Sequence, residues 1–230
     1  MSEYKHLFFD LDHTLWDTDK NAKESLGEIY SEVQLSNDQL PPFESYYGRY
    51  KEHNEQLWGL YSENKIGREA LRINRFRYAL EDFKINDYQL AVAIADQFIQ
   101  RTPYKPYLID DAIFVLDELS VKYKMSIITN GFRETQHIKL ASSGLTKYFD
   151  HVFISEEIGF NKPDTRIFKH ALDMTGTKLT EAVMIGDTYE TDIIGAHTAG
   201  IDQVYFKFNP PEKQKATFKI TALKELLHII

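Results

Sequence analysis

Cysteine is absent from this 230-residue chain. Disulfide bonds and thiolate metal sites are therefore excluded. No apolar stretch approaches membrane-spanning length, and Met1–Lys5 lead straight into a predicted strand without an apolar signal segment. We therefore expect a soluble, cytoplasmic protein. The sequence leaves a monomer and a homodimer equally open.

An excess of positive charge is also missing, because the net charge is -8. This balance argues against a nucleic-acid polymer or an anionic membrane surface as the main partner. A small anionic substrate stays compatible with it, since one local positive group can hold a phosphate. The hydrophobic and charged fractions, 43% and 27%, are ordinary for a globular protein.

Short apolar runs alternate with helical patterns in the second half of the chain. Lys5–Phe9 forms another such run near the N-terminus. Alternation of this kind predicts an α/β fold, a Rossmann-like parallel sheet with helices on both faces. The predicted strands of the second half are 125–128, 152–154, 182–185 and 203–206, and the predicted helices are 133–143, 165–175, 190–199 and 223–230.

Residues 18–101 contain no convincing strand and show helical spacing of apolar residues, as in Ile73, Phe76 and Leu80. We therefore predict an α-helical cap domain at 18–101, inserted into a catalytic core made of 1–17 and 102–230. Arg68, Arg72 and Arg75 share one helix face, which we interpret as a solvated stripe.

Every predicted core strand except the last ends in residues suited to phosphate chemistry. Because the carboxyl ends of parallel strands share one edge of a sheet, these residues can converge. The groups are Asp10 and Asp12 after the first strand, Thr129-Asn130-Gly131 after the second, Lys162-Pro163 beyond the third, and Gly186-Asp187 with Asp192 after the fourth.

Three carboxylates in one crevice repel each other by roughly 4 kcal/mol per close pair. An all-oxygen cluster suits Mg²⁺, which can bridge to a substrate phosphate. Mg²⁺ and Lys162 together can offset the charge of a phosphoryl group, and Thr129 with the amides at Asn130-Gly131 can bind its oxygens. Taken alone, Lys162 could be a solvated loop lysine and Asp192 a helix first-turn acid.

The four segments, in this order, resemble the four motifs of the haloacid dehalogenase superfamily, and the insert resembles its helical C1-type cap. The resemblance implies an aspartyl-phosphate mechanism with Mg²⁺. Asp10 would be the nucleophile and a metal ligand, and Asp12 the general acid and base that also lends its carbonyl to the metal. Asp187 would bind the metal, Thr129, Asn130 and Lys162 would bind phosphate, and Thr14 and Asp192 would support the site.

The dehalogenases of that superfamily lack an acid at the position of Asp12, so its presence favours phosphate esters, whose leaving oxygen needs a proton. The segments 127–132 and 153–159 and the pair Leu57-Trp58 resemble bacterial pyrimidine 5′-nucleotidases. This implies a nucleoside 5′-monophosphate as substrate. A sugar-phosphate phosphatase or phosphomutase is the alternative, and an inactive interaction module is a further one.

Three aromatic residues are candidates for substrate contact: Trp16, Trp58 and Phe132. Trp16 follows the first motif, Trp58 has a counterpart in the nucleotidases, and Phe132 follows the phosphate-binding loop. Each could instead pack in a hydrophobic core, which is the commoner place for an aromatic side chain.

Overall fold

A computed structural model describes residues 4–34, 39–207 and 212–230. The chain divides into two compact units, Met1–Thr18 with Pro106–Ile230, and Asp19–Lys105. These divisions lie one and four residues from the boundaries expected from the sequence. Residues 1–3, on which the expectation of no export signal partly rests, lie outside the described residues. Across the described ranges, no helix is both long and apolar enough to cross a membrane.

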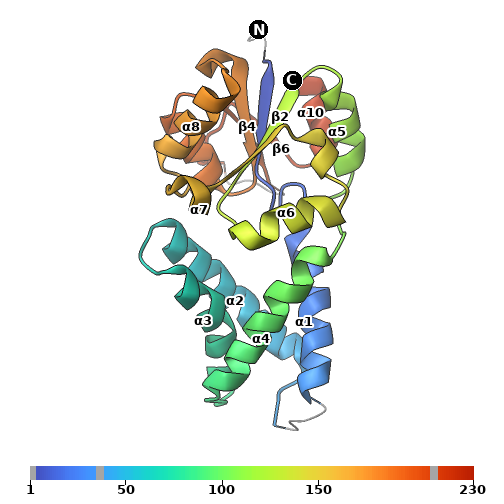
Figure 1. Cartoon of the computed structure of the whole chain (residues 1–230), viewed down its shortest axis with the longest axis vertical. Helices are drawn as coiled ribbons and strands as arrows, with labels where there is room; N and C mark the ends of the chain where they lie inside the picture. The colour runs from blue at the N-terminus through green and yellow to red at the C-terminus, as the bar shows by residue number, and fades with distance from the viewer. Residues whose placement is uncertain (1–3, 35–38, 208–211) are drawn as a thin grey trace. The chain divides into compact units, whose positions relative to one another are not determined.

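The first unit is built on a parallel sheet, six-stranded over the described residues, with the order β3-β2-β1-β4-β5-β6 (Figure 1). The strands are β1 His6–Phe9, β2 Lys124–Thr129, β3 His151–Ile154, β4 Ala182–Gly186, β5 Asp202–Phe206 and β6 Phe218–Ile220. The α/β prediction is confirmed. β1 lies in the middle, so the loop that follows it opens between the ends of β2 and β4.

Helices cover both faces of the sheet, because alternate strand residues point to opposite faces. Leu7 and Phe9 pack with α5, α6 and α10, whereas Phe8 packs with α8 and α9. The helices of this unit are α5 Ala112–Ser120, α6 Arg133–Ser142, α7 Ser155–Ile158, α8 Thr165–Thr175, α9 Ile194–Thr198 and α10 Leu226–Ile229. Shorter turns are η2 Thr146–Tyr148, η3 Leu179–Glu181, η4 Tyr189–Ile193 and η5 Leu223–Glu225.

The second unit is helical, with α1 Thr18–Gln34, α2 Phe43–Ser62, α3 Arg68–Glu81 and α4 Tyr88–Arg101, and ends in η1 Thr102–Tyr104. Its core joins apolar faces of all four helices. The prediction of a solvated arginine stripe is wrong for Arg75, which is 5% exposed. Its guanidinium lies over the rings of Phe76 and Phe98 and donates to Asn54 Oδ1. Three residues are less than one full helical turn, so the Arg75 side chain points in a different direction from that of Arg72. That direction faces the aromatic core.

His6 is a buried titratable group of β1, with Nε2 2.9 Å from Ser126 Oγ and its ring stacked on Phe8. Burial lowers the pKa of His6 from 6.5 to about 4. Between these values the unfolded chain binds the proton and the folded chain does not. The contribution of neutral His6 to the free energy of unfolding is therefore present above pH 6.5 and is lost as the pH falls toward 4.

We expect wild type to lose about 2 kcal/mol more unfolding free energy between pH 7 and pH 5 than a His6→Gln variant. Glutamine keeps a hydrogen-bonding amide but does not titrate. Urea denaturation of both proteins at the two pH values measures this difference. Parallel losses in the two proteins would contradict the assignment.

Candidate active site

The loop after β1 places two acids at the carboxyl edge of the sheet. The Asp10 backbone N–H donates to Ile185 O at 2.8 Å, which extends the pairing with β4. Leu11 then turns into the core, where it is fully buried. The N–H groups of Leu15 and Trp16 both donate to Leu11 O, so the chain folds back at once. This tight turn fixes the backbone from which Asp10 and Asp12 project.

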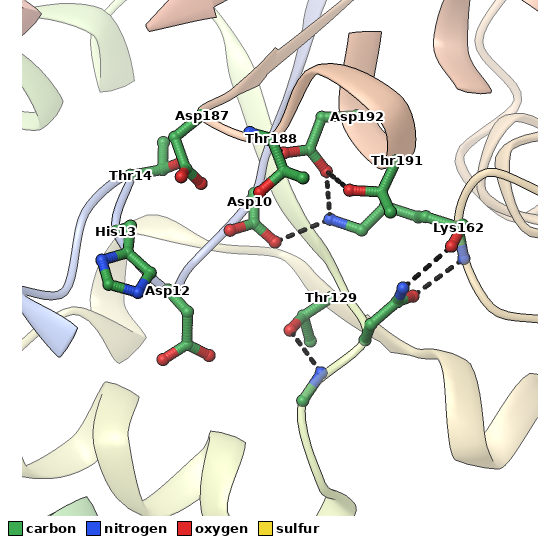
Figure 2. A network of polar contacts seen from close by, with 12 residues as sticks. Asp10, Asp12, His13, Thr14, Thr129, Lys162, Asp187, Thr188, Thr191 and Asp192 are labelled. Carbon is green, nitrogen blue, oxygen red and sulfur yellow. Dashed lines mark hydrogen bonds and ion pairs between the residues drawn. The ribbon is translucent and has the colours of Figure 1, made fainter. Parts of the chain in front are cut away.

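Lys162 lies between two carboxylates from different motifs (Figure 2). Its Nζ is 2.6 Å from Asp10 Oδ1 and 2.6 Å from Asp192 Oδ1, and its side chain is only 2% exposed. Burial alone would lower the pKa of the Lys162 ammonium, but the two carboxylates outweigh it and raise the pKa. Lys162 is therefore a permanent buried cation, and the sequence alternative of a solvated loop lysine is wrong.

Negative charge nevertheless exceeds positive charge around Asp10. Burial raises the pKa of Asp10 well above its usual range, and Asp192, Asp187 and Asp12 raise it further, against the opposing pull of Lys162. Burial, followed by the charge of Asp192, also raises the pKa of Asp187 to about 7. The site therefore favours an additional cation or protons.

A metal ion fits this charge imbalance. Carboxylate oxygens of Asp10, Asp187 and Asp192 lie within 4.8 Å of one another. Thr14 Oγ1 lies 3.4 Å from Asp187 Oδ1 and donates to it. Hard oxygen donors with little nitrogen or sulfur suit Mg²⁺. The residues present therefore fit the cation that the sequence predicts.

Asp192 is held more tightly than the other acids of the cluster. It is 1% exposed, and its second oxygen accepts the Thr188 N–H at 3.0 Å. A Cβ at Gly186 would lie 2.4 Å from Asp192 Oδ2, so only glycine leaves room for this carboxylate against the end of β4. Because both Asp192 oxygens accept hydrogen bonds from the protein, Asp192 is placed to orient Lys162 and the Asp187 loop.

The loop after β2 lies against the same site. Thr129 Oγ1 accepts the Gly131 N–H at 3.0 Å and lies 3.3 Å from Gln136 Oε1, to which it donates. The Asn130 side chain pairs with the backbone of Lys162. Its Nδ2 donates to Lys162 O at 2.9 Å and its Oδ1 accepts the Lys162 N–H at 2.8 Å. This reciprocal pair ties the β2 loop to the Lys162 backbone, so the Asn130 side chain positions Lys162.

Asp12 has its own cation, Lys139 on α6. The Lys139 Nζ donates to both Asp12 oxygens, at 2.6 and 2.9 Å, and Thr18 Oγ1 donates to Asp12 Oδ1 at 2.9 Å. Burial alone would raise the pKa of Asp12, but the Lys139 ammonium outweighs it and holds that pKa below its usual range. The two neighbouring acids of the first motif thus sit in opposite electrostatic environments.

The three aromatic candidates have different surroundings. Trp16 is 1% exposed in the core of the first unit, with the Lys139 ammonium 4.5 Å from its ring centroid. Phe132 is 4% exposed at the start of α6. Trp58 is half-buried on α2 of the helical unit, edge-on to Tyr61. The burial of Trp16 and Phe132 favours a packing role for both, and substrate contact by Trp58 stays a prediction.

Sequence reasoning missed Gln136 and Lys139, which occupy one face of α6 at a spacing of three residues. Both are buried, Gln136 at 0% and Lys139 at 9% exposure. A signal for them existed in the chain. The face that they share also carries Leu140, so two polar residues stand where a sheet-covering helix would normally be apolar.

Most of the chain resembles known proteins. The model of a family described as haloacid dehalogenase-like hydrolase matches residues 7–206. YfnB of Bacillus subtilis, described as a HAD-hydrolase, is 30% identical over 100% of this chain and 97% of its own length. A structure of YfnB bound to magnesium has a TM-score of 0.87 at 28% identity, covering 99% of this chain and 98% of that one.

Two relatives carry a more specific description. The pyrimidine 5′-nucleotidase PynA of Streptococcus pneumoniae is 31% identical over 97% of this chain and 94% of its own length. The pyrimidine 5′-nucleotidase YjjG of Escherichia coli is 29% identical over 97% of this chain and 96% of its own length. The similarity therefore spans both units of the chain.

Proposed function

The chain belongs to the haloacid dehalogenase-like hydrolase family, and from this membership we propose that it is a Mg²⁺-dependent phosphomonoester hydrolase that acts through an aspartyl-phosphate. The observation that carries the proposal is the buried set of Asp10, Lys162, Asp187 and Asp192 at one sheet edge. A lysine ammonium and a metal-binding acid cluster beside one carboxylate are what attack on a phosphate requires.

Asp10 is the nucleophile in this proposal. One of its oxygens forms a bond to phosphorus while the bond from phosphorus to the leaving oxygen breaks. Lys162, 2.6 Å from Asp10 Oδ1, offsets the repulsion between the carboxylate and the phosphoryl oxygens. On phosphate binding, the Thr129 hydroxyl exchanges its bond to Gln136 Oε1 for one to a phosphoryl oxygen, and the Gly131 N–H exchanges its bond to Thr129 Oγ1 in the same way.

Asp10 and Asp187, with the main-chain carbonyl of Asp12, are the proposed holders of the Mg²⁺ ion. When bound, the ion supplies positive charge to the transferring phosphoryl oxygens. Asp192 and Thr14 hold Lys162 and Asp187 in place through the contacts described above.

Asp12 transfers the proton in both halves of the reaction. Its carboxylate, ionised at rest beside Lys139, first takes a proton from solvent and then gives that proton to the leaving oxygen when the aspartyl-phosphate forms. It then takes a proton from the water whose oxygen bonds to phosphorus as the Asp10 ester breaks. A haloacid reaction needs no such donor, so the presence of Asp12 supports phosphate esters as the substrate class.

We propose a nucleoside 5′-monophosphate, and most directly a pyrimidine nucleotide, as the substrate. The support is the similarity to PynA and YjjG across both units, including the helical one. The test is phosphate release with Mg²⁺ from a panel of nucleoside monophosphates and sugar phosphates. The highest kcat/KM should fall on a pyrimidine nucleotide. A preference for sugar phosphates, or an isomerised product without free phosphate, would overturn the nucleotide assignment, and inactivity across the panel would overturn hydrolysis itself.

Magnesium should also stabilise the fold, and more so at high pH. Because the pKa of Asp187 is raised to about 7, its carboxyl favours the fold when protonated, and that stability is lost as the pH rises through about 7. Mg²⁺ replaces the lost proton. We expect about 5 °C of Mg²⁺-induced rise in Tm at pH 8 under saturating metal, and less at pH 5.5. Asp187→Asn should remove most of the rise, and an equal rise in that variant would contradict the assigned ligand.

A further inference from the structure

Lys139 holds Asp12 by a geometry that a simple surface ion pair does not need. Its Nζ donates to both carboxylate oxygens, at 2.6 and 2.9 Å, across 127 residues of sequence. The lysine side chain is 11% exposed and that of Asp12 is 25% exposed, so both partners are largely withdrawn from water. Removing two charges from water costs about as much as their attraction returns. The pair therefore adds little to the free energy of unfolding, although it restricts both side chains to one geometry.

The surroundings fix the lysine as well as the acid. The Trp16 ring lies 4.5 Å from the Lys139 Nζ, on the face where an ammonium is attracted to the π system. Trp16 is itself tied down, because it bridges to Asp12 on one side and to Leu108 on the other. The loop that carries Asp12 therefore also carries the ring that orients the lysine.

The two oxygens of Asp12 are not equivalent. Oδ1 accepts from Lys139 and from Thr18 Oγ1, whereas Oδ2 accepts from Lys139 at the longer distance of 2.9 Å. Oδ1 is thus the anchored oxygen. Oδ2 can exchange its hydrogen bond for a leaving-group oxygen or a water molecule while Oδ1 keeps the carboxyl group in place.

We propose that Lys139 is a positioning residue for the proton transfers of Asp12, a role that rests on the proposed phosphohydrolase function. Lys139 keeps its own protons throughout. Asp12 is ionised while it is paired with Lys139, so it first takes a proton from solvent at Oδ2 when the phosphate adds negative charge to the site. In the first half-reaction that proton moves from Asp12 Oδ2 to the leaving oxygen as the phosphorus–oxygen bond breaks and the Asp10–phosphorus bond forms. In the second half-reaction water returns a proton to Asp12 as its oxygen bonds to phosphorus and the Asp10–phosphorus bond breaks.

Leaving groups separate this role from a general effect of charge or folding. An alkoxide leaving group, as in a nucleotide or glycerol phosphate, needs the proton from Asp12, whereas p-nitrophenolate leaves without one. For Lys139→Met we expect kcat/KM to fall by about 10- to 100-fold on the alkyl phosphate. With p-nitrophenyl phosphate the fall in kcat/KM should stay below about 3-fold, since only bond formation by Asp10 is measured there.

Three further variants make the result decisive. Lys139→Arg keeps the charge and should recover part of the alkyl-phosphate activity. In an Asp12→Asn background, adding Lys139→Met should cause no further fall in kcat/KM on the alkyl phosphate, because the lysine acts through Asp12. Lys147→Met is the matched control, since Lys147 also lies over an aromatic ring, that of Tyr148, and pairs with Asp117. It should leave both activities unchanged.

Equal losses on both substrates for a folded Lys139→Met protein would overturn the proposal and point to a general electrostatic role. Additive losses in the double variant would overturn it as well. If wild type itself releases no phosphate from any ester, the proposed function fails before the role of Lys139 is reached, so the two failures are distinguishable. A Lys139→Met protein that does not fold is replaced by Lys139→Gln, with the same expected split between substrates.

Discussion

Asparagine in place of Asp10 is expected to lower kcat for phosphate release by on the order of 10⁴-fold or more. The amide is nearly isosteric with the carboxylate, but it is not a nucleophile for phosphorus and carries no charge for the metal. Lys162 keeps its contact with Asp192, so its ammonium stays in the site. Initial rates on the best ester of the panel, with saturating Mg²⁺, measure the loss.

The same variant should be at least as stable as wild type in the absence of metal. The pKa of Asp10 is raised by burial and by its acidic neighbours, so the ionised carboxylate opposes folding at neutral pH. Removing that charge relieves the repulsion, as is common where function costs stability. Asp173→Asn, at an exposed pair with Lys169, is the control for the substitution itself. Turnover near the wild-type rate in Asp10→Asn would contradict a covalent role for this residue.

Methionine in place of Lys162 should damage both stability and activity. The Lys162 ammonium joins Asp10 and Asp192, and without it two buried carboxylates face each other. Breaking a buried pair from one side costs about 3–5 kcal/mol. Without the ammonium beside the phosphoryl group, we also expect kcat/KM to fall by about 10²–10³-fold. Denaturant unfolding and initial rates measure the two effects.

A second substitution tests the origin of the lost stability. Adding Asp192→Asn to Lys162→Met removes one of the stranded charges and should restore part of the unfolding free energy without restoring activity. Lys169→Met, at an exposed lysine, should change neither quantity by more than a small amount. Full stability in Lys162→Met alone would show that the buried acids are compensated in another way.

The main features of the fold were predictable because they depend on local patterns. Apolar runs marked β1 to β5, and the acids, the threonine and the lysine at their ends could be assigned to one sheet edge by the geometry of a parallel sheet. β6 was missed because its Phe-Lys-Ile is only three residues long, too short for an alternation to stand out.

The details of the site were less predictable because they depend on how helices rotate against the sheet. The pairing of Asp12 with Lys139 spans 127 residues and is fixed only by the packing of α6. The reciprocal pairing of the Asn130 side chain with the Lys162 backbone could not be predicted either, because it joins two loops that are 32 residues apart in the sequence. Trp16 lies next in sequence to the loop that carries Asp10 and Asp12, yet the backward turn at Leu11 puts its ring in the core.

The covalent intermediate is the central claim, and mass spectrometry of acid-quenched protein tests it most directly. In an Asp12→Asn variant the aspartyl-phosphate should form from p-nitrophenyl phosphate and break down slowly, because the base for the attacking water is missing. We predict one added phosphoryl group on the peptide that contains Asp10, and none in the Asp10→Asn protein. A phosphoryl group on another residue, or rapid turnover with no labelled protein at any quench time, would contradict the mechanism.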